Sequence, residues 1–86
     1  MSTNSKVPSW SISGICTETR ELKTKDGVIW MFVIKLMAMG GIYELQTRDD
    51  QMFKQFGEGG EYLVSGTFDH FNGKIRFALQ NMKAAS

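Results

Sequence analysis

The chain has 86 residues, of which 42% are hydrophobic and 22% are charged. This length has room for one domain, and the composition argues against global disorder. The formal net charge of +1 neither indicates nor excludes a polyanionic ligand, because the outcome depends on where the charges lie. The single cysteine, Cys16, excludes an intramolecular disulfide and fits a reducing compartment.

No apolar run reaches the ~18 residues of a membrane-spanning segment. The longest one, over 28–39, is interrupted by Lys35. Residues 1–8 are polar and lack the apolar core of a signal peptide. We therefore expect a cytoplasmic protein without membrane contact, located in the host cytoplasm if it is viral. The expected organisation is a flexible tail over 1–8, one domain over 9–83 and a C-terminal tail over 84–86.

Alternating apolar and polar residues predict a first strand that runs from Ser9 towards Leu22. Gly14 is expected to mark a bulge or a tight bend within it. The apolar surroundings of its cysteine favour a buried structural thiol over a reactive one. With a bend at the glycine, one face of the strand enters the core and carries Trp10, Ile12 and Cys16.

Asp26-Gly27 is a hairpin signal that leads into a second strand over 28–37. Both faces of this strand are apolar, whereas a small domain has one core. The second apolar face must therefore meet another subunit, a ligand or a later segment. One face carries Trp30, Phe32, Ile34 and Leu36, and the other carries Ile29, Met31, Val33 and Met37.

Gly40-Gly41 predicts the next turn, and 42–48 a third strand. Asp49 is a good helix N-cap, and Gly57 a good stop, so the sequence predicts a helix of about two turns over 49–56. A helix this short is not stable in isolation, so its apolar side must pack against the sheet. The side chains that pack there would be Phe53 and Phe56.

A fourth strand is predicted over 61–68 and a fifth over 74–82, joined by a turn at Asn72-Gly73. Gly66 is expected to bend the fourth strand. Alternation assigns Tyr62, Val64, Ile75, Phe77 and Leu79 to the core.

The order of three strands, one short helix and two strands predicts an all-β fold. Closure into a small five-stranded barrel, with the helix capping one end between strands three and four, is the OB-fold layout. An SH3-like barrel is the main alternative, although it usually lacks a helix at this point.

The stretches SISGIC, DGVIWMFVI, EYLVSGTF and NGKIRFAL resemble small OB-fold single-stranded DNA-binding proteins, and the resemblance covers about 9–83. Two groups are similar: the primosomal single-stranded DNA-binding proteins and those of filamentous phages. The long acidic C-terminal tail of bacterial single-stranded DNA-binding proteins is not in this sequence, which favours these two groups. The resemblance implies largely sequence-independent binding of single-stranded DNA, a role in DNA replication and a homodimer.

In the phage-type proteins, aromatic side chains stack on bases, and Arg and Lys side chains meet phosphates. The resemblance assigns stacking to Trp30, Phe32, Tyr43 and Phe71, and phosphate contacts to Arg20, Lys25 and Arg48. Outward positions of the fifth strand add Lys74 and Arg76 as candidate contacts. For the aromatic residues, a core or dimer contact is the alternative, and for the cations a solvated strand face. Four acidic residues gather around the helix, which should face away from the ligand: Asp49, Asp50, Glu58 and Glu61.

Catalytic signals are weak. The one histidine, His70, lies in a predicted turn, and Cys16 belongs to another element. No Cys/His spacing suits zinc, and no glycine-rich loop is followed by Lys-Ser or Lys-Thr. We expect no enzyme activity, no metal and no cofactor.

The second hypothesis is an OB-fold protein-interaction module without nucleic-acid binding. Its partner surface would include Met31, Met37 and Met39. A third, weaker interpretation is RNA binding as in cold-shock proteins, whose aromatic-rich signature runs this sequence lacks.

Overall fold

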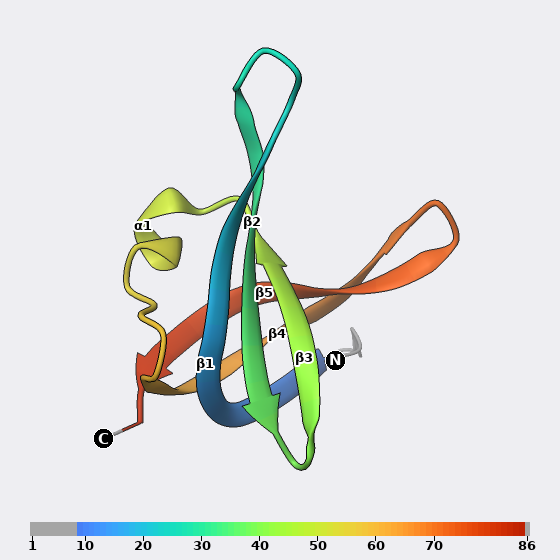
Figure 1. Ribbon diagram of the computed structural model, residues 1–86. Helices are drawn as coiled ribbons and strands as arrows, with labels where there is room; N and C mark the ends of the chain where they lie inside the picture. Colours follow the sequence, from blue (N-terminus) through green and yellow to red (C-terminus); the bar gives the residue numbers. More distant parts are fainter. Residues whose placement is uncertain (1–8, 86) are drawn as a thin grey trace, which may run out of the picture.

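The computed structural model describes residues 9–85, except for the side chain of Phe71. Five strands close into a barrel in the order β1-β2-β3-β5-β4, which confirms the predicted OB-type barrel (Figure 1). The one helix lies between β3 and β4. The elements are β1 (Ser9–Lys23), β2 (Ile29–Ala38), β3 (Gly41–Thr47), α1 (Asp50–Phe53), β4 (Glu61–Phe71) and β5 (Lys74–Ala84).

Strand β1 bends strongly and pairs with two neighbouring strands (Figure 1). Its first half pairs with β4 from Ser9 to Ile15, and its second half pairs with β2. We expected a bulge or a tight bend at Gly14, and the bulge lies instead at Thr17, which has no partner in the β1–β2 register. Gly14 is needed for another reason, since a Cβ there would lie 2.6 Å from the carbonyl oxygen of Met37.

The barrel interior is filled by apolar side chains from every strand. Trp10 is 9% exposed, and its indole Nε1 donates a hydrogen bond to the carbonyl oxygen of Thr67 at 2.7 Å. Phe56, which follows the helix, packs against Tyr62 with ring centroids 4.7 Å apart and closes one end. The buried core consists of Trp10, Ile12, Cys16, Ile34, Leu36, Ala38, Leu45, Phe56, Tyr62, Val64 and Leu79.

Cys16 is a buried thiol, as predicted, with 1% of its surface exposed. Burial raises the pKa of this thiol, a backbone hydrogen bond with Glu18 opposes that rise, and the charge of Glu58 adds to it. A thiol with a raised pKa stays protonated at neutral pH and is a poor nucleophile. Cys16 therefore acts as a small core residue.

Helix α1 is half as long as predicted. Its four residues, Asp50–Phe53, form one turn instead of about two. After it, the amides of Gln55 and Phe56 bond to carbonyls three residues back, a tighter pattern than that of an α-helix. This tightening brings Phe56 to the barrel end without a second helical turn.

The β4–β5 hairpin is longer than predicted and projects beyond the barrel (Figure 1). Its turn is the predicted Asn72-Gly73, and both residues have positive φ angles, 53° and 77°. Because the hairpin leaves the barrel, Ile75 is 62% exposed, and its predicted core position is wrong. Gly66, where we expected a bend, lies at a register shift with Gln80 as the extra residue on β5. Strand β5 extends to Ala84, whereas residues 1–8, the predicted N-terminal tail, lie outside the described residues.

The β2–β3 turn lies one residue earlier than predicted. Ala38 pairs with Gly41, so the two turn residues are Met39 and Gly40, with φ angles of 50° and 77°. Two successive positive φ angles match a type I′ turn, which favours Asn-Gly. Met39 therefore holds a backbone conformation that methionine disfavours.

Replacing Met39 by asparagine should raise the free energy of unfolding by about 1 kcal/mol, because asparagine tolerates the left-handed conformation at lower cost. Met39 is 84% exposed, so little packing is lost. Urea denaturation measures the gain, and M39A is the control that shortens the side chain but keeps the strain. Equal stability of M39N and M39A would contradict the prediction.

Candidate nucleic-acid interface

A groove opens where β3 and β5 stop pairing. These strands pair in parallel only at Leu45–Phe77 and Gln46–Ala78, and the preceding residues of β5, 74–76, belong to the projecting hairpin. The resulting β3–β5 groove has a volume of about 630 Å³. It is lined by Leu22, Trp30, Ile42, Tyr43, Glu44, Gln46, Lys74, Ile75, Arg76 and Phe77.

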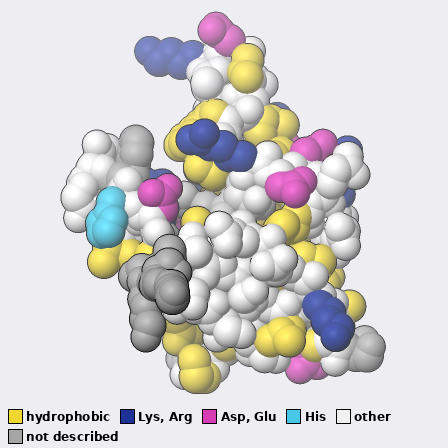
Figure 2. Space-filling model, turned by 180° about the vertical axis from the view of Figure 1, so that it is seen from behind, with side chains coloured by type: hydrophobic (Ala, Val, Ile, Leu, Met, Phe, Trp, Pro, Cys, Tyr) yellow, Lys and Arg dark blue, Asp and Glu magenta, His cyan; other side chains and the backbone are white. Residues whose placement is uncertain are grey.

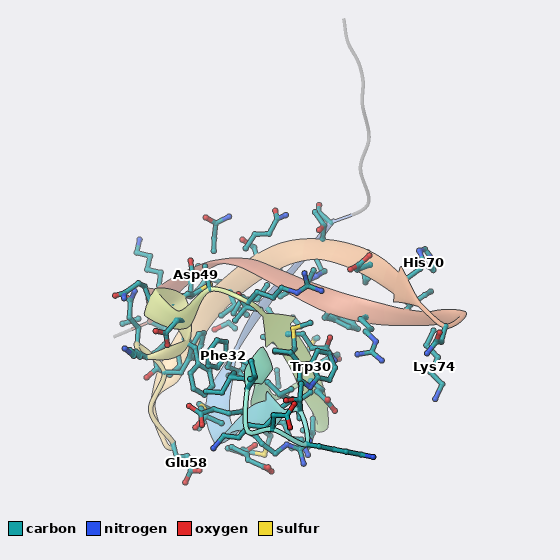
Figure 3. The ribbon with its side chains drawn as sticks, turned by 90° about the horizontal axis from the view of Figure 1, so that it is seen from above. Trp30, Phe32, Asp49, Glu58, His70 and Lys74 are labelled. Atoms are coloured by element: carbon teal, nitrogen blue, oxygen red, sulfur yellow. The ribbon has the colours of Figure 1, made fainter. Side chains whose placement is uncertain are left out.

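Trp30 is the most exposed aromatic side chain of the described part of this groove, at 44%. In the β1–β2 register, Leu22 pairs with Met31 and Lys23 with Ile29, so Trp30 is an extra residue on β2. Bulges of this kind redirect a side chain and bend the strand. Figure 3 shows Trp30 on the side of the molecule that faces the β4–β5 hairpin and Lys74.

Phe32 is not available as a stacking platform, which corrects the prediction that paired it with Trp30. Its side chain is 7% exposed and stacks on Phe53 with ring centroids 4.4 Å apart. Figure 3 shows Phe32 towards the helix side, away from Lys74. The bulge at Trp30 thus separates two aromatic residues that simple alternation places on one face.

Tyr43 joins the groove from β3, as predicted, but it is half-buried. Its ring meets that of Phe77 edge-on at a centroid distance of 6.0 Å. Phe77 also contacts Trp10 and Phe68, so the groove floor continues into the core. Such a floor offers apolar contact to a flat ligand.

The basic wall of the groove comes from β5. Lys74 lies near the hairpin tip, and it forms no ion pair within residues 9–85. Arg76 donates a hydrogen bond to the Oε1 atom of Gln46 at 3.2 Å, which links the two walls. Both residues were predicted as phosphate contacts, and the structure brings both into the groove.

Arg48 lies beside the groove in a second hollow of about 340 Å³. This hollow shares Gln46 and Arg76 with the groove, and its lining also includes Met31 and Asp69. Arg48 is exposed, but Asp69 brings a negative charge into the same hollow. The bridge between Arg76 and Gln46 therefore separates two neighbouring depressions.

Besides Phe32 and Arg48, two further predicted site residues do not line the groove. Arg20 is exposed on β1 opposite Val33, and Lys25 lies in the β1–β2 loop. The side chain of Phe71 lies outside the described part of the structure. On the face seen in Figure 2, acidic and basic side chains are scattered around a largely uncharged centre and form no area of one sign.

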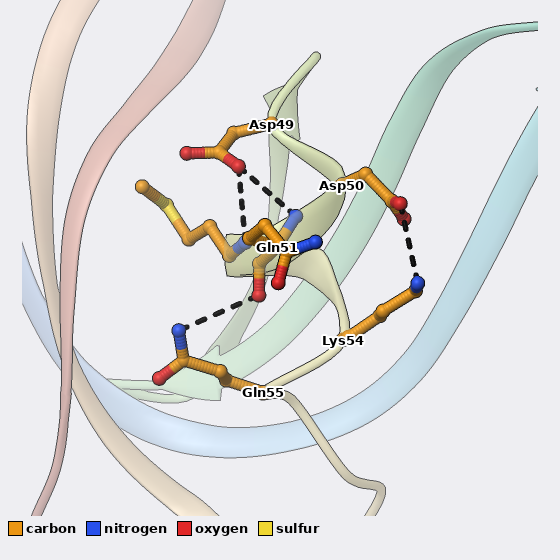
Figure 4. Close-up of polar contacts among 6 residues, drawn as sticks. Asp49, Asp50, Gln51, Lys54 and Gln55 are labelled. Carbon is orange, nitrogen blue, oxygen red and sulfur yellow. Dashed lines mark hydrogen bonds and ion pairs between the residues drawn. The ribbon is translucent and has the colours of Figure 1, made fainter.

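The helix end of the barrel is acidic and lies away from the groove. Asp49 caps α1, because its Oδ1 atom accepts hydrogen bonds from the amides of Gln51 and Met52 at 3.0 and 3.2 Å (Figure 4). Asp50 pairs with Lys54 at 3.3 Å. Figure 3 shows Asp49 and Glu58 on the side opposite to Lys74. Two of the acidic residues expected around the helix, Asp49 and Glu58, thus lie away from Lys74 (Figure 3).

Several residues that line the groove were not predicted as site residues from the sequence, among them Ile42, Glu44, Gln46 and Ile75. Their alternation along β3 and β5 showed which residues share a face. It did not show that the strands diverge and leave that face open. The short parallel pairing that opens the groove depends on the closed barrel.

Within residues 9–85, no three His, Cys, Asp or Glu side chains gather in a way that could hold a metal ion. His70 is exposed at the β4–β5 hairpin, and Cys16 is buried in β1. In the same part of the chain, no helix is long and apolar enough to span a membrane.

No family model and no curated protein matches this sequence. Solved structures do match. The mitochondrial single-stranded DNA-binding protein Rim1 from S. cerevisiae is similar in two crystal forms. One has a TM-score of 0.75 at 10% identity over 94% of this chain and 96% of Rim1. The other has a TM-score of 0.73 at 11% identity over 93% and 97%.

The second OB-fold domain of replication protein A from Methanococcus maripaludis is also similar. Its TM-score is 0.56 at 13% identity, over 93% of this chain and 84% of that domain. At such low identities the likeness concerns the fold. Together with the closed β1-β2-β3-β5-β4 barrel, it shows that this chain has an OB fold.

Proposed function

We propose that the protein binds single-stranded DNA, largely independently of its sequence, in the β3–β5 groove. The observation that carries this proposal is the half-exposed Trp30, which a bulge directs into a groove with Lys74 and Arg76 on its other wall. Base–aromatic stacking contributes about 1–3 kcal/mol per base and tolerates every base. The Rim1 and replication protein A structures, named as single-stranded DNA-binding and replication proteins, support it through their fold.

In the proposed mechanism, a base stacks on Trp30 while neighbouring bases contact the apolar floor at Tyr43 and Ile75. Phosphates lie along Lys74 and Arg76, with Arg48 as a further contact beyond the bridge. A duplex hides its base faces and cannot use the stacking residues. The protein would therefore prefer single strands.

The cellular role that fits this binding is protection of single strands in DNA replication, in the cytoplasm. The sequence resemblance to the filamentous-phage and primosomal groups supports this part of the proposal. The proposal does not include a chemical reaction on the bound DNA.

The experiment is an anisotropy titration of a dye-labelled, mixed-sequence single strand and its duplex at two salt concentrations. Tight binding of the single strand, weakened by salt, is expected. K74Q should weaken binding for all sequences and lower the slope of log K against log salt by about 1. The control is K54Q, which removes the same charge from the helix side, where Lys54 pairs with Asp50.

Absence of single-strand binding at low salt would overturn the proposal. An equal loss of affinity for the single strand in K74Q and K54Q would show that only the net charge of the protein matters and that the groove is not the binding site. A ribose oligomer of the same sequence tests RNA as the alternative ligand.

The proposal includes a homodimer, supported by an apolar row on the outer face of the barrel. Ile15 pairs with Met37, and Met37 with Ile42, so the three side chains are neighbours across β1, β2 and β3. Leu63 on β4, opposite Ser13, extends the row. All four side chains are exposed: Ile15 by 41%, Met37 by 46%, Ile42 by 57% and Leu63 by 44%.

Light scattering tests the dimer by measuring the mass in solution. A dimer with no affinity for single strands would favour the second hypothesis, an OB-fold protein-interaction module. A monomeric protein that binds single strands would contradict the proposed homodimer and leave the DNA-binding proposal intact.

A further inference from the structure

Glu44 is an unexpected residue in a groove that would hold a polyanion. It lines the β3–β5 groove and is exposed, and it forms no hydrogen bond or ion pair within the described residues. Its cross-strand neighbour Lys35 forms its ion pair with Glu18, at 3.6 Å, and not with Glu44. A free carboxylate therefore points into the groove.

This carboxylate determines how a single strand can lie. A phosphate beside Glu44 would be repelled, whereas Lys74 and Arg76 on β5 attract phosphates. The sugar–phosphate backbone must then follow β5, with the bases directed towards β3. Under the proposed function, on which this inference rests, Glu44 meets base edges.

The neighbouring Gln46 completes the polar part of the β3 wall. A guanidinium has donors only, so the amide atom that faces Arg76 is the oxygen, at 3.2 Å. The NH₂ group of Gln46 is then directed away from Arg76. The wall thus offers a charged acceptor from Glu44 and a neutral donor from Gln46, two residues apart on the same face of β3.

We infer that Glu44 is a specificity-determining residue that makes the groove prefer bases with an exocyclic amine over thymine and uracil. Cytosine, adenine and guanine each place an amino group at an edge, where a carboxylate can accept from it. Thymine and uracil carry carbonyl oxygens at both exocyclic positions, and their single N–H lies between them. A carboxylate that approaches this N–H meets two partial negative charges.

The test compares oligodeoxycytidine with oligodeoxyuridine of equal length, in anisotropy titrations at pH 7.5. These bases have the same ring size and lack a methyl group, and they differ by the amine or carbonyl at position 4 and the proton at N3. The wild-type protein should bind the cytidine oligomer about fivefold more tightly, a difference of the size expected for one charge-assisted hydrogen bond.

E44Q should bind both oligomers within about twofold, because an amide can accept from the amine or donate to the carbonyl. The matched control is E58Q, since Glu58 is an exposed acid on the opposite side (Figure 3). E58Q changes the net charge equally and should keep the fivefold preference.

Equal binding of the two oligomers by the wild-type protein would overturn the inference and leave the proposed function standing. A preference that survives in E44Q, or disappears in E58Q as well, would also overturn it. If neither oligomer binds at low salt, the proposed function fails, and this inference fails with it.

Discussion

Replacing Gly66 by alanine should lower the free energy of unfolding by more than about 3 kcal/mol, a large part of the 5–15 kcal/mol that is typical of a domain. A Cβ atom at Gly66 would overlap the carbonyl oxygen of Ala78 and lie 2.9 Å from Cζ2 of Trp10. Neither atom can easily move, because one is backbone and the other belongs to a buried ring held by the Trp10–Thr67 hydrogen bond. The barrel would have to separate β4 from β5 at this point.

Urea denaturation followed by circular dichroism measures this loss, and G41A is the matched control. Gly41 has no positive φ angle, and its added Cβ would meet nothing closer than 4.0 Å. G41A should therefore keep its stability or gain up to about 1 kcal/mol. If G66A were as stable as G41A, the close packing of β4 on β5 described above would be wrong.

Replacing Trp30 by alanine should weaken binding of single-stranded DNA about tenfold or more, because one stacking contact of about 1–3 kcal/mol is lost. The stability of the fold should change little, since the side chain is half-exposed on a bulge outside the core. W30F should retain much of the affinity, because phenylalanine also offers a π-face.

The control for Trp30 is V28A on the same hairpin. Val28 is 60% exposed and does not line the β3–β5 groove. V28A should bind like the wild-type protein. Unchanged affinity in W30A, with single-strand binding intact, would place the stacking site elsewhere on the barrel.

Much of the fold was predictable because its signals are local. Asp49 was predicted as a helix cap from its side-chain chemistry alone, and Asn72-Gly73 as a turn from its tolerance of positive φ angles. Alternation gave Trp10 and Tyr62 as core residues, because each lies on a part of its strand that stays within the barrel. Such features depend on one segment and its immediate neighbours.

The wrong predictions concern residues whose environment depends on two segments of the chain at once. The position of the bulge at Trp30 depends on how β1 and β2 match in length, so one strand's alternation grouped Trp30 with Phe32. Phe32 is buried because Phe53 of the helix stacks on it, a contact that neither segment specifies alone. Ile75 has a core-like pattern, but its hairpin leaves the barrel before that position.

The split pairing of β1 has a consequence for how the chain folds as it is synthesised. The first half of β1 finds its partner only in β4, which starts at Glu61 and emerges late from the ribosome. Until then, one side of β1 has no hydrogen-bonding neighbour, and the core cannot close around Trp10 and Ile12. Barrel formation must therefore wait until β4 has been synthesised, and nascent chains that stall before β4 would expose an unpaired strand edge to aggregation.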